Sequence, residues 1–350
     1  MRAGRQRAVS SAEVVIAVLV VIALLPASAP VIAPLAFALL AIALLWPVQH
    51  GMQAFLPKYV ALLATLTVVM IALLAFAWIF SWSFGRVGGW MISNAARFQQ
   101  HYDEVRRWLE EQGIDVDVLW ANNVGTASVV RMVQTVTTRL NSTFSFWLVA
   151  LTYLLLGVME VEGFANRLKT MPYPVARQLL LDGSRQTAEK LRRYMRIRTI
   201  MSIVTGLVVW GFTSAFGLPL AKEWGAIAFV LNYIPFIGPL VATLLPTAFA
   251  LIQFDNWQSA LILFLGLNLI QFTLGSYIEP RVSGNALSLS PVVVLFSVFA
   301  WGYLWGIFGA FIGVPISIAL VTFCRNHPSS RWVSELLGRD SEDDHGDDSG

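Results

Sequence analysis

The sequence predicts an all-α polytopic membrane protein with about eight transmembrane helices. Apolar residues make up 57% of its 350 residues and charged residues only 13%, whereas roughly a quarter of a soluble domain is charged. Uncharged runs long enough to cross a ~30 Å hydrocarbon core recur along the chain. One of these runs, 224–254, carries prolines and glycines in its interior, which predicts a broken or re-entrant helix pair.

Residues 1–84 are expected to form a region of three spans. Val14–Trp46 carries no charge over 33 residues, which is too long for one helix and enough for two short ones. The prolines of Pro26–Pro34 are expected to break this run into a hairpin, and Tyr59–Phe84 gives the third span. A basic start and the Ala27–Ala29 stretch resemble a signal peptide, but the apolar run that follows favours retained helices.

Residues 85–143 differ in character, because acidic and basic residues are balanced there. Apolar side chains recur at helical spacing on both sides of Gly113–Gly125, which predicts two amphipathic helices joined by a loop. We interpret this part as a small segment on the extracytoplasmic membrane surface. A dedicated ligand-binding domain is the alternative, although no residue pattern there resembles a site.

Residues 144–198 are expected to contain the fourth span and then a basic cytoplasmic segment. Nine Lys or Arg and three acidic residues fall within 161–198, and the positive-inside rule places such a segment in the cytoplasm. Four spans separate it from the basic N-terminus, so both ends of the chain are predicted to be cytoplasmic. The stretch Lys190–Arg198 is interpreted as an anchor at anionic headgroups and not as a nucleic-acid site.

Residues 199–324 form the predicted transport core, and residues 325–350 a cytoplasmic, acidic, disordered tail. Lipid cannot satisfy the backbone groups freed by a broken helix, so the interrupted run 224–254 must be shielded by protein or line a wet cavity. Whether this run crosses the membrane or re-enters is left open. In the last apolar run, four glycines between Gly302 and Gly313 have the spacing of close helix packing, and Pro315 allows a kink.

Polar residues near the end of the core could carry function. Asn268, Gln271, Gly275 and Glu279 recur at helical spacing and share one face of a regular helix. In one interpretation they form a polar stripe that leads to Glu279 as a cation or proton acceptor. In the other, the two amides bond neighbouring helices while Glu279 and Arg281 form a structural ion pair. The sequence favours neither interpretation over the other.

No residue pattern suggests catalysis, a metal site or a cofactor. The four histidines lie outside the long apolar runs, and the single cysteine, Cys324, cannot form an internal disulfide. No nucleophile with a neighbouring base, carboxylate pair or zinc motif occurs in apolar sequence. The protein is therefore not expected to be an enzyme.

Four motifs in the C-terminal half carry a resemblance to a known family. They are RRYMRIRTIMSIVTG (192–206), LNYIPFIGPLVATLLP (231–246), IEPRVSGNALSLSPVVVL (278–295) and WGIFGAFIGVPISIAL (305–320). In order and spacing they resemble the autoinducer-2 exporter family of bacterial inner-membrane proteins. The resemblance implies an oligomeric secondary transporter that is not an ATPase. Some members are regarded as exporters of the signalling furanone and others as sodium/proton antiporters, so the substrate stays open.

We therefore expect a multi-pass inner-membrane protein that exports a small hydrophilic solute, such as an autoinducer-2-like signal. Cation/proton antiport through Glu279 is the alternative, and a membrane scaffold without transport is a third possibility. The expected partners are the solute or a monovalent cation and proton, the lipid bilayer and further copies of the chain, with no nucleic acid. The residues expected to shape or line the path are Asn232, Pro235, Gly238, Pro239, Asn268, Gln271, Glu279 and Arg281.

Overall fold

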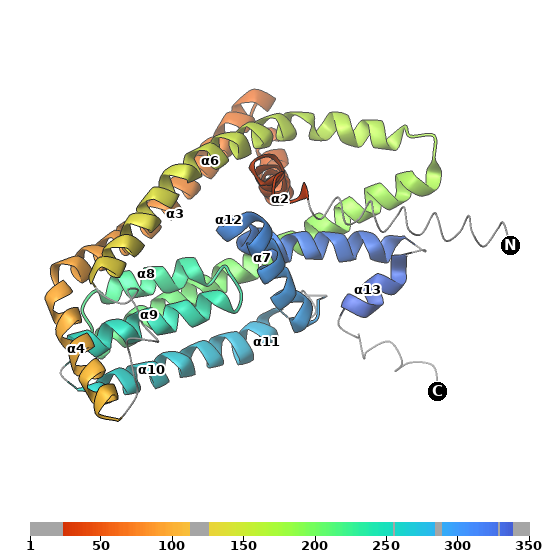
Figure 1. The fold of residues 1–350 in the computed structure, drawn as a ribbon. Helices are drawn as coiled ribbons and strands as arrows, with labels where there is room; N and C mark the ends of the chain where they lie inside the picture. The colour runs from red at the N-terminus through yellow and green to blue at the C-terminus, as the bar shows by residue number, and fades with distance from the viewer. Residues whose placement is uncertain (1–23, 113–125, 255, 284–288, 328–329, 339–350) are drawn as a thin grey trace, which may run out of the picture. The chain divides into compact units, whose positions relative to one another are not determined.

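The helical membrane fold predicted from the sequence is confirmed. The computed structural model describes residues 24–112, 126–254, 256–283, 289–327 and 330–338 (Figure 1). Within these ranges every regular element is a helix. Six helical stretches are long and apolar enough to cross a membrane. They are Ala29–Gln53, Lys58–Ser93, Ser145–Lys169, Pro174–Ala215, Trp257–Val282 and Pro291–Asn326.

Several helices run past the predicted membrane boundaries. Helix α3 spans Lys58–Ser93, α6 spans Thr126–Lys169 and α7 spans Pro174–Ala215. The second predicted amphipathic helix is therefore continuous with the fourth span. The first one corresponds to α4, Ala95–Glu111, and the predicted loop at 113–125 lies outside the described residues. Polar stretches do not end these helices, because Lys, Arg, Glu and Gln are good helix formers.

The two ends of the described chain are also helical. The first of the two short N-terminal helices predicted lies mostly outside the described residues, and α2 covers Ala29–Gln53 with a proline in its first turn, where no donor is lost. Beyond α12, a short helix α13 covers Arg331–Leu337. The backbone N–H of Ser290 donates to the carbonyl of Leu337 at 3.2 Å. Part of the tail expected to be disordered is thus ordered, and residues 339–350 lie outside the described residues.

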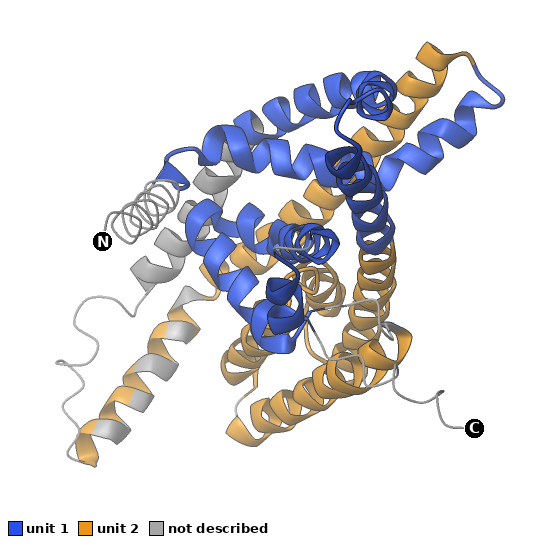
Figure 2. Ribbon diagram, turned by 90° about the vertical axis from the view of Figure 1, so that its right-hand side faces the viewer, with its two compact units in different colours: residues 1–56, 145–192, 287–350 blue, residues 57–144, 193–286 orange. Residues whose placement is uncertain are grey.

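The chain divides into two compact units, the first assembled from three separate segments and the second from two (Figure 2). Unit 1 comprises residues 1–56, 145–192 and 287–350, and unit 2 comprises residues 57–144 and 193–286. Unit 2 contains five further elements after α7. They are α8 (Ala221–Leu231), α9 (Ile237–Gln253), α10 (Trp257–Phe272) and the π-helix η1 (Thr273–Ile278), followed by the short α11 (Glu279–Ser283).

In unit 2, α8 and α9 form an antiparallel helical hairpin, called here the first hairpin. The rings of Trp224, near the start of α8, and Phe249, near the end of α9, lie 5.2 Å apart. With 11 and 17 residues, the two helices are about 16 and 25 Å long, so neither crosses a ~30 Å core. The interrupted run is therefore a hairpin with the dimensions of a re-entrant pair, and its tip is the turn at residues 232–236.

The first hairpin is held in the interior of unit 2 by close helix contacts. Helix α8 packs on α3, and α9 packs on α10 (Figure 1). A Cβ atom added at Gly206 of α7 would lie 2.9 Å from the carbonyl oxygen of Gly225 in α8, so the two backbones touch because both residues lack side chains. Fully buried Ile227, Leu263 and Leu267 fill the space around them.

In unit 1, α12 (Pro291–Asn326) is a second hairpin and not one straight helix. Its backbone leaves helical geometry at Trp305 and Gly306, where Gly306 has φ 65°. The hydroxyl oxygens of Ser297 and Ser317, 20 residues apart, lie 2.6 Å from each other. The last apolar run is thus broken at Gly306. Pro315, where a kink was expected, lies inside the second helical arm.

The glycines of the last run pack the two arms of the second hairpin together, as their spacing predicted. A Cβ atom at Gly313 would lie 2.8 Å from the carbonyl oxygen of Ser297, and one at Gly309 would overlap the carbonyl oxygen of Trp301. Both contacts join one arm to the other. Both units therefore contain a discontinuous helix folded back on itself, an arrangement typical of secondary transporters.

Candidate functional site: a buried ion pair under the tip of the first hairpin

The face of α7 that points into unit 2 carries a polar stripe. Tyr194, Arg198, Ser202 and Thr205 follow one another at spacings of four, four and three residues, and all four are buried. This spacing places them on one side of the helix. Polar groups are costly at membrane depth, so a buried row of them indicates either a polar interior or a path for a polar solute.

Arg198 forms an ion pair with Glu279 at the centre of this site. Its Nη1 donates to Oε1 of Glu279 at 2.6 Å, and the two side chains are 6% and 17% exposed. Glu279 follows directly after η1, and π-helical turns occur preferentially at functional sites. A charge-assisted hydrogen bond this short and this well shielded is far stronger than an exposed surface pair.

The tip of the first hairpin is tied to the same face of α7. The amide Nδ2 of Asn232 donates to the hydroxyl of Ser202 at 3.2 Å. The phenol of Tyr233 donates to the hydroxyl of Thr199 at 3.1 Å. Both anchor residues on α7 lie within about one helical turn of Arg198. The tip, the polar stripe and the ion pair therefore form one contiguous cluster within unit 2.

This cluster has donors that no described residue satisfies. The Nε–H of Arg198 and the hydroxyl of Tyr194 are buried and have no hydrogen-bond partner within the described part of the chain. Tyr194 is close enough to both charges of the ion pair to interact with them electrostatically. Buried polar groups are nearly always bonded to protein or water. The arrangement can therefore bind acceptor oxygens of water or of a small polar solute.

Four of the residues predicted to shape the path lie at the tip. Asn232 caps the end of α8, and Pro235 is buried in the turn. Gly238 and Pro239 lie in the first turn of α9. A Cβ atom at Gly238 would overlap the carbonyl oxygen of Leu231, so this glycine allows the two helices to meet.

The other predicted residues are not brought together as one stripe. Asn268 is exposed, and its amide donates to the carbonyl of Phe264 in its own helix at 2.8 Å. Gln271 is half-buried, with no described partner for its Nε2. The π-helical turn that follows shifts the register by about one residue, so Asn268 and Glu279 no longer share a face.

The predicted ion pair between Glu279 and Arg281 is not formed. The carboxylate of Glu279 pairs with Arg198 of α7 instead. The guanidinium of Arg281 lies over the ring of Tyr277, 3.7 Å from its centre, in a cation–π contact. Arg281 is exposed, so its contact is a surface feature separate from the buried pair.

We expect Asn268→Leu to leave transport by reconstituted protein within about twofold of wild type. The side chain of Asn268 bonds only its own helix at an exposed position, and such bonds contribute little to stability. The rate of solute release from proteoliposomes measures this. Asn232→Leu is the contrasting variant, because it removes the bond between the hairpin tip and α7. Equal losses in the two variants would contradict the expectation.

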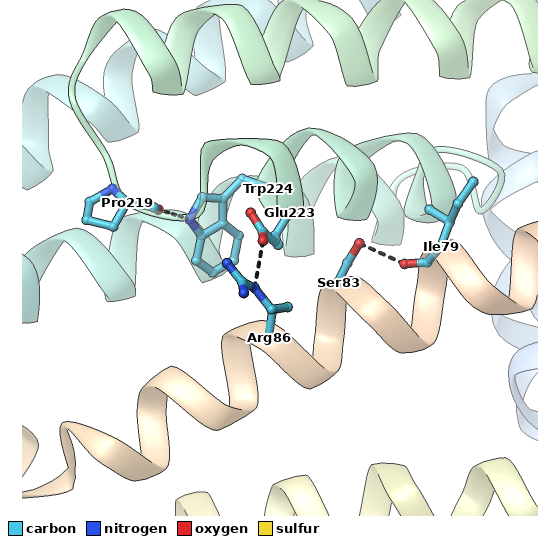
Figure 3. Close-up of polar contacts among 6 residues, drawn as sticks. All are labelled: Ile79, Ser83, Arg86, Pro219, Glu223 and Trp224. Carbon is cyan, nitrogen blue, oxygen red and sulfur yellow. Dashed lines mark hydrogen bonds and ion pairs between the residues drawn. The ribbon is translucent and has the colours of Figure 1, made fainter.

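A second ion pair lies at the opposite end of the first hairpin (Figure 3). Glu223, in the first turn of α8, accepts from Nε of Arg86 at 3.1 Å, and the two side chains are 5% and 60% exposed. A carboxylate is stabilised at a helix N-terminus. The neighbouring indole of Trp224 donates to the carbonyl of Pro219 at 3.1 Å. Glu223 is thus a buried acid of unit 2 that was not among the residues predicted to form the site.

Sequence reasoning also missed Arg198, which was counted among the basic residues of the cytoplasmic segment. Its side chain is nevertheless buried and aimed at Glu279. The signal that could have identified it is the spacing of Tyr194, Arg198 and Ser202, which aligns a charge with polar residues on one helix face. No group of three or more potential metal ligands occurs within the described parts of the chain.

The chain is similar to bacterial transport proteins. The AI-2 transport protein TqsA of Escherichia coli K12 is 29% identical over 315 residues, which cover 89% of this chain and 90% of that protein. The putative transport protein YhhT of the same strain is 26% identical over 84% of this chain and 82% of its own length. A putative transport protein of Borreliella burgdorferi is 31% identical over 54% of this chain and 52% of its own length.

The family comparison covers almost the whole chain. The sequence pattern of the AI-2E family transporters matches residues 14–328. The matched region includes both discontinuous hairpins and the Arg198–Glu279 pair. The chain therefore belongs to the AI-2E transporter family and is a multi-pass membrane transporter.

Proposed function

We propose that this protein is a secondary transporter that exports a small hydrophilic solute, of which an autoinducer-2-like signal is one candidate. The observation that carries the proposal is the buried Arg198–Glu279 pair beside the tip of a re-entrant hairpin. A broken helix at membrane depth supplies backbone groups that a polar solute can use. The unpartnered donors of Arg198 and Tyr194 suit a solute that offers acceptor oxygens.

Cation/proton antiport is the second candidate, and the position of Glu279 favours it. Its carboxylate is shielded and is held by a single guanidinium. A carboxylate that titrates or binds a cation only when it leaves such a partner can couple two fluxes. Solute export needs no titration at this position. The two candidates therefore differ in whether the charge of Glu279 is required for a proton flux.

The variant Glu279→Gln separates the two candidates in proteoliposomes that contain a pH-sensitive dye. If the protein is an antiporter, Na⁺ or K⁺ gradients produce a pH change in wild type that this variant lacks. If it is an exporter, no pH change follows, and wild-type vesicles release a loaded furanone signal faster than protein-free vesicles. We expect release, slowed at least tenfold in Glu279→Gln, because the variant breaks the charge pair beside the tip.

Glu223→Gln is the matched control. Glu223 is a buried glutamate paired with an arginine in the same unit, but it lies at the base of the first hairpin. The same chemical change there should leave release above one third of the wild-type rate. Equal loss in both variants would contradict a special role for Glu279. No pH change and no release from wild-type vesicles would favour the scaffold over both transport candidates.

We also propose an orientation and an assembly. The basic segment of residues 161–198 places the N- and C-termini in the cytoplasm and residues 85–143 outside, within the bacterial inner membrane. Two re-entrant hairpins leave this assignment unchanged, because each returns the chain to the side that it entered. A homo-oligomer is the assembly that the family resemblance implies. The proposed transport role involves no nucleic acid and no bound cofactor.

A further inference from the structure

The tip of the first hairpin contains a strained residue. Phe236 has φ 63° and ψ −53°, a conformation that residues with a side chain rarely adopt. The N–H of Ile237 donates to the carbonyl of Pro235 at 2.7 Å, which closes a γ-turn around Phe236. This positive-φ γ-turn is the rare and strained type. Phe236 as a residue is 48% exposed, so burial of its side chain contributes little to offset the strain.

The strained turn lies between two well-anchored parts of the chain. On one side, Asn232 and Tyr233 are bonded to hydroxyls of α7. On the other side, the N–H of Gly238 donates to the carbonyl of Ile234 at 2.9 Å, and its Cα packs against Leu231. These contacts hold the ends of the turn fixed. Strain at Phe236 is therefore imposed by its surroundings and would be released if the turn rearranged.

We propose that Phe236 is the gating residue of the first hairpin, with a backbone strain that favours a second conformation of the tip. The proposal rests on the transport function proposed above and adds the moving element to it. Releasing the strain means returning Phe236 to ordinary dihedral angles. This movement pulls on Asn232 and Tyr233, whose partners lie beside Arg198 on α7. The tip thereby links opening of the turn to the ion pair.

A glycine would be the expected residue if this turn had only a static role. Glycine adopts positive φ without steric cost, and it is the usual residue wherever the chain needs this conformation. The tip already contains a glycine two residues later, at Gly238. A large side chain at the strained position instead raises the energy of the closed turn relative to other conformations. Strained residues of this kind cluster at switch regions of proteins.

The test compares Phe236→Gly with Phe236→Ala by hydrogen exchange of the purified protein in lipid nanodiscs. Glycine removes the strain, so the amides of residues 232–234 and 236–238 should exchange about tenfold more slowly than in wild type. Alanine removes the ring but keeps the strain, and exchange there should stay within about twofold of wild type. Thermal unfolding confirms that both variants are folded, and amides of α10 serve as the internal reference.

Transport by the same two variants completes the test. Solute release should be about fivefold slower for Phe236→Gly, because the tip without strain is held more firmly in this conformation, and within about twofold of wild type for Phe236→Ala, because the strain is kept. Unchanged or faster exchange in Phe236→Gly would overturn the proposed switch. Slower exchange in that variant, combined with no transport by wild type, would support the switch and overturn the proposed transport function.

Discussion

Replacing Arg198 by methionine is expected to lower the stability of the protein by about 3–5 kcal/mol and to abolish transport. Both effects follow from the pair with Glu279, whose side chains are 6% and 17% exposed. Removing one member of a buried pair leaves the other charge without its partner, which is costly in a shielded site. Thermal unfolding in detergent measures the first effect, and solute release from proteoliposomes measures the second.

The double variant Arg198→Met, Glu279→Leu distinguishes the contribution of the ion pair to stability from its contribution to transport. A buried ion pair can often be replaced by apolar residues of similar size with little loss of stability. We therefore expect the double variant to unfold within about 1 kcal/mol of wild type while transport remains absent. Transport by the double variant at the wild-type rate would show that the pair has only a structural role. Loss of folding in both variants would contradict the expected rescue.

A comparison of the two ion pairs explains why the one at the tip should have the larger effect. In the Arg86–Glu223 pair at the base of the first hairpin, the arginine side chain is 60% exposed. Water can therefore solvate that guanidinium whether or not the pair is formed. In the pair near the tip, both side chains are shielded. The charges near the tip can separate only if another polar group or a proton replaces one partner.

The architecture was predictable to the extent that it depends on composition and on prolines and glycines. The run 224–254 lacks charge and contains Pro235, Gly238 and Pro239, which was sufficient to predict a broken helix. Its hairpin form was not predictable, because a run of this length is compatible with one crossing or with a hairpin. Packing decides between them, through contacts such as that of Trp224 with Phe249.

The site was predictable only in part, because its central contact joins residues far apart in the sequence. Glu279 was identified as a polar residue near the end of an apolar run, but its partner lies 81 residues away in α7. Helical spacing predicted a stripe through Asn268, and the π-helical turn at 273–278 removes that alignment. A π-helical turn has no simple sequence signature, so regular periodicity fails at such a position.

The strain at Phe236 could not be predicted from the sequence either. Positive φ is ordinarily predicted from glycine or asparagine, and the sequence offers phenylalanine at this position. The conformation is fixed by the contacts on both sides of the turn. A local rule that fails at one residue is expected where function or strain overrides propensity.

Replacing Gly238 by alanine is expected to destabilise the protein by about 1–3 kcal/mol and to reduce transport at least tenfold. The added Cβ atom would overlap the carbonyl oxygen of Leu231. This neighbour is backbone and cannot rotate away, so α8 and α9 must separate at the tip. Separation would stretch the bond of Asn232 to Ser202. Thermal unfolding and solute release measure the two effects.

Gly211→Ala is the matched control, because it makes the same change on the exposed side of α7 in the same unit. A Cβ atom there has no neighbour within 4 Å, and alanine favours a helix over glycine by about 0.5–1 kcal/mol. This variant should therefore be at least as stable as wild type and transport normally. Equal stability of the two variants would mean that close contact at Gly238 does not hold the tip. If the Gly238→Ala protein is destabilised but transports normally, the close contact at Gly238 matters for stability and not for transport.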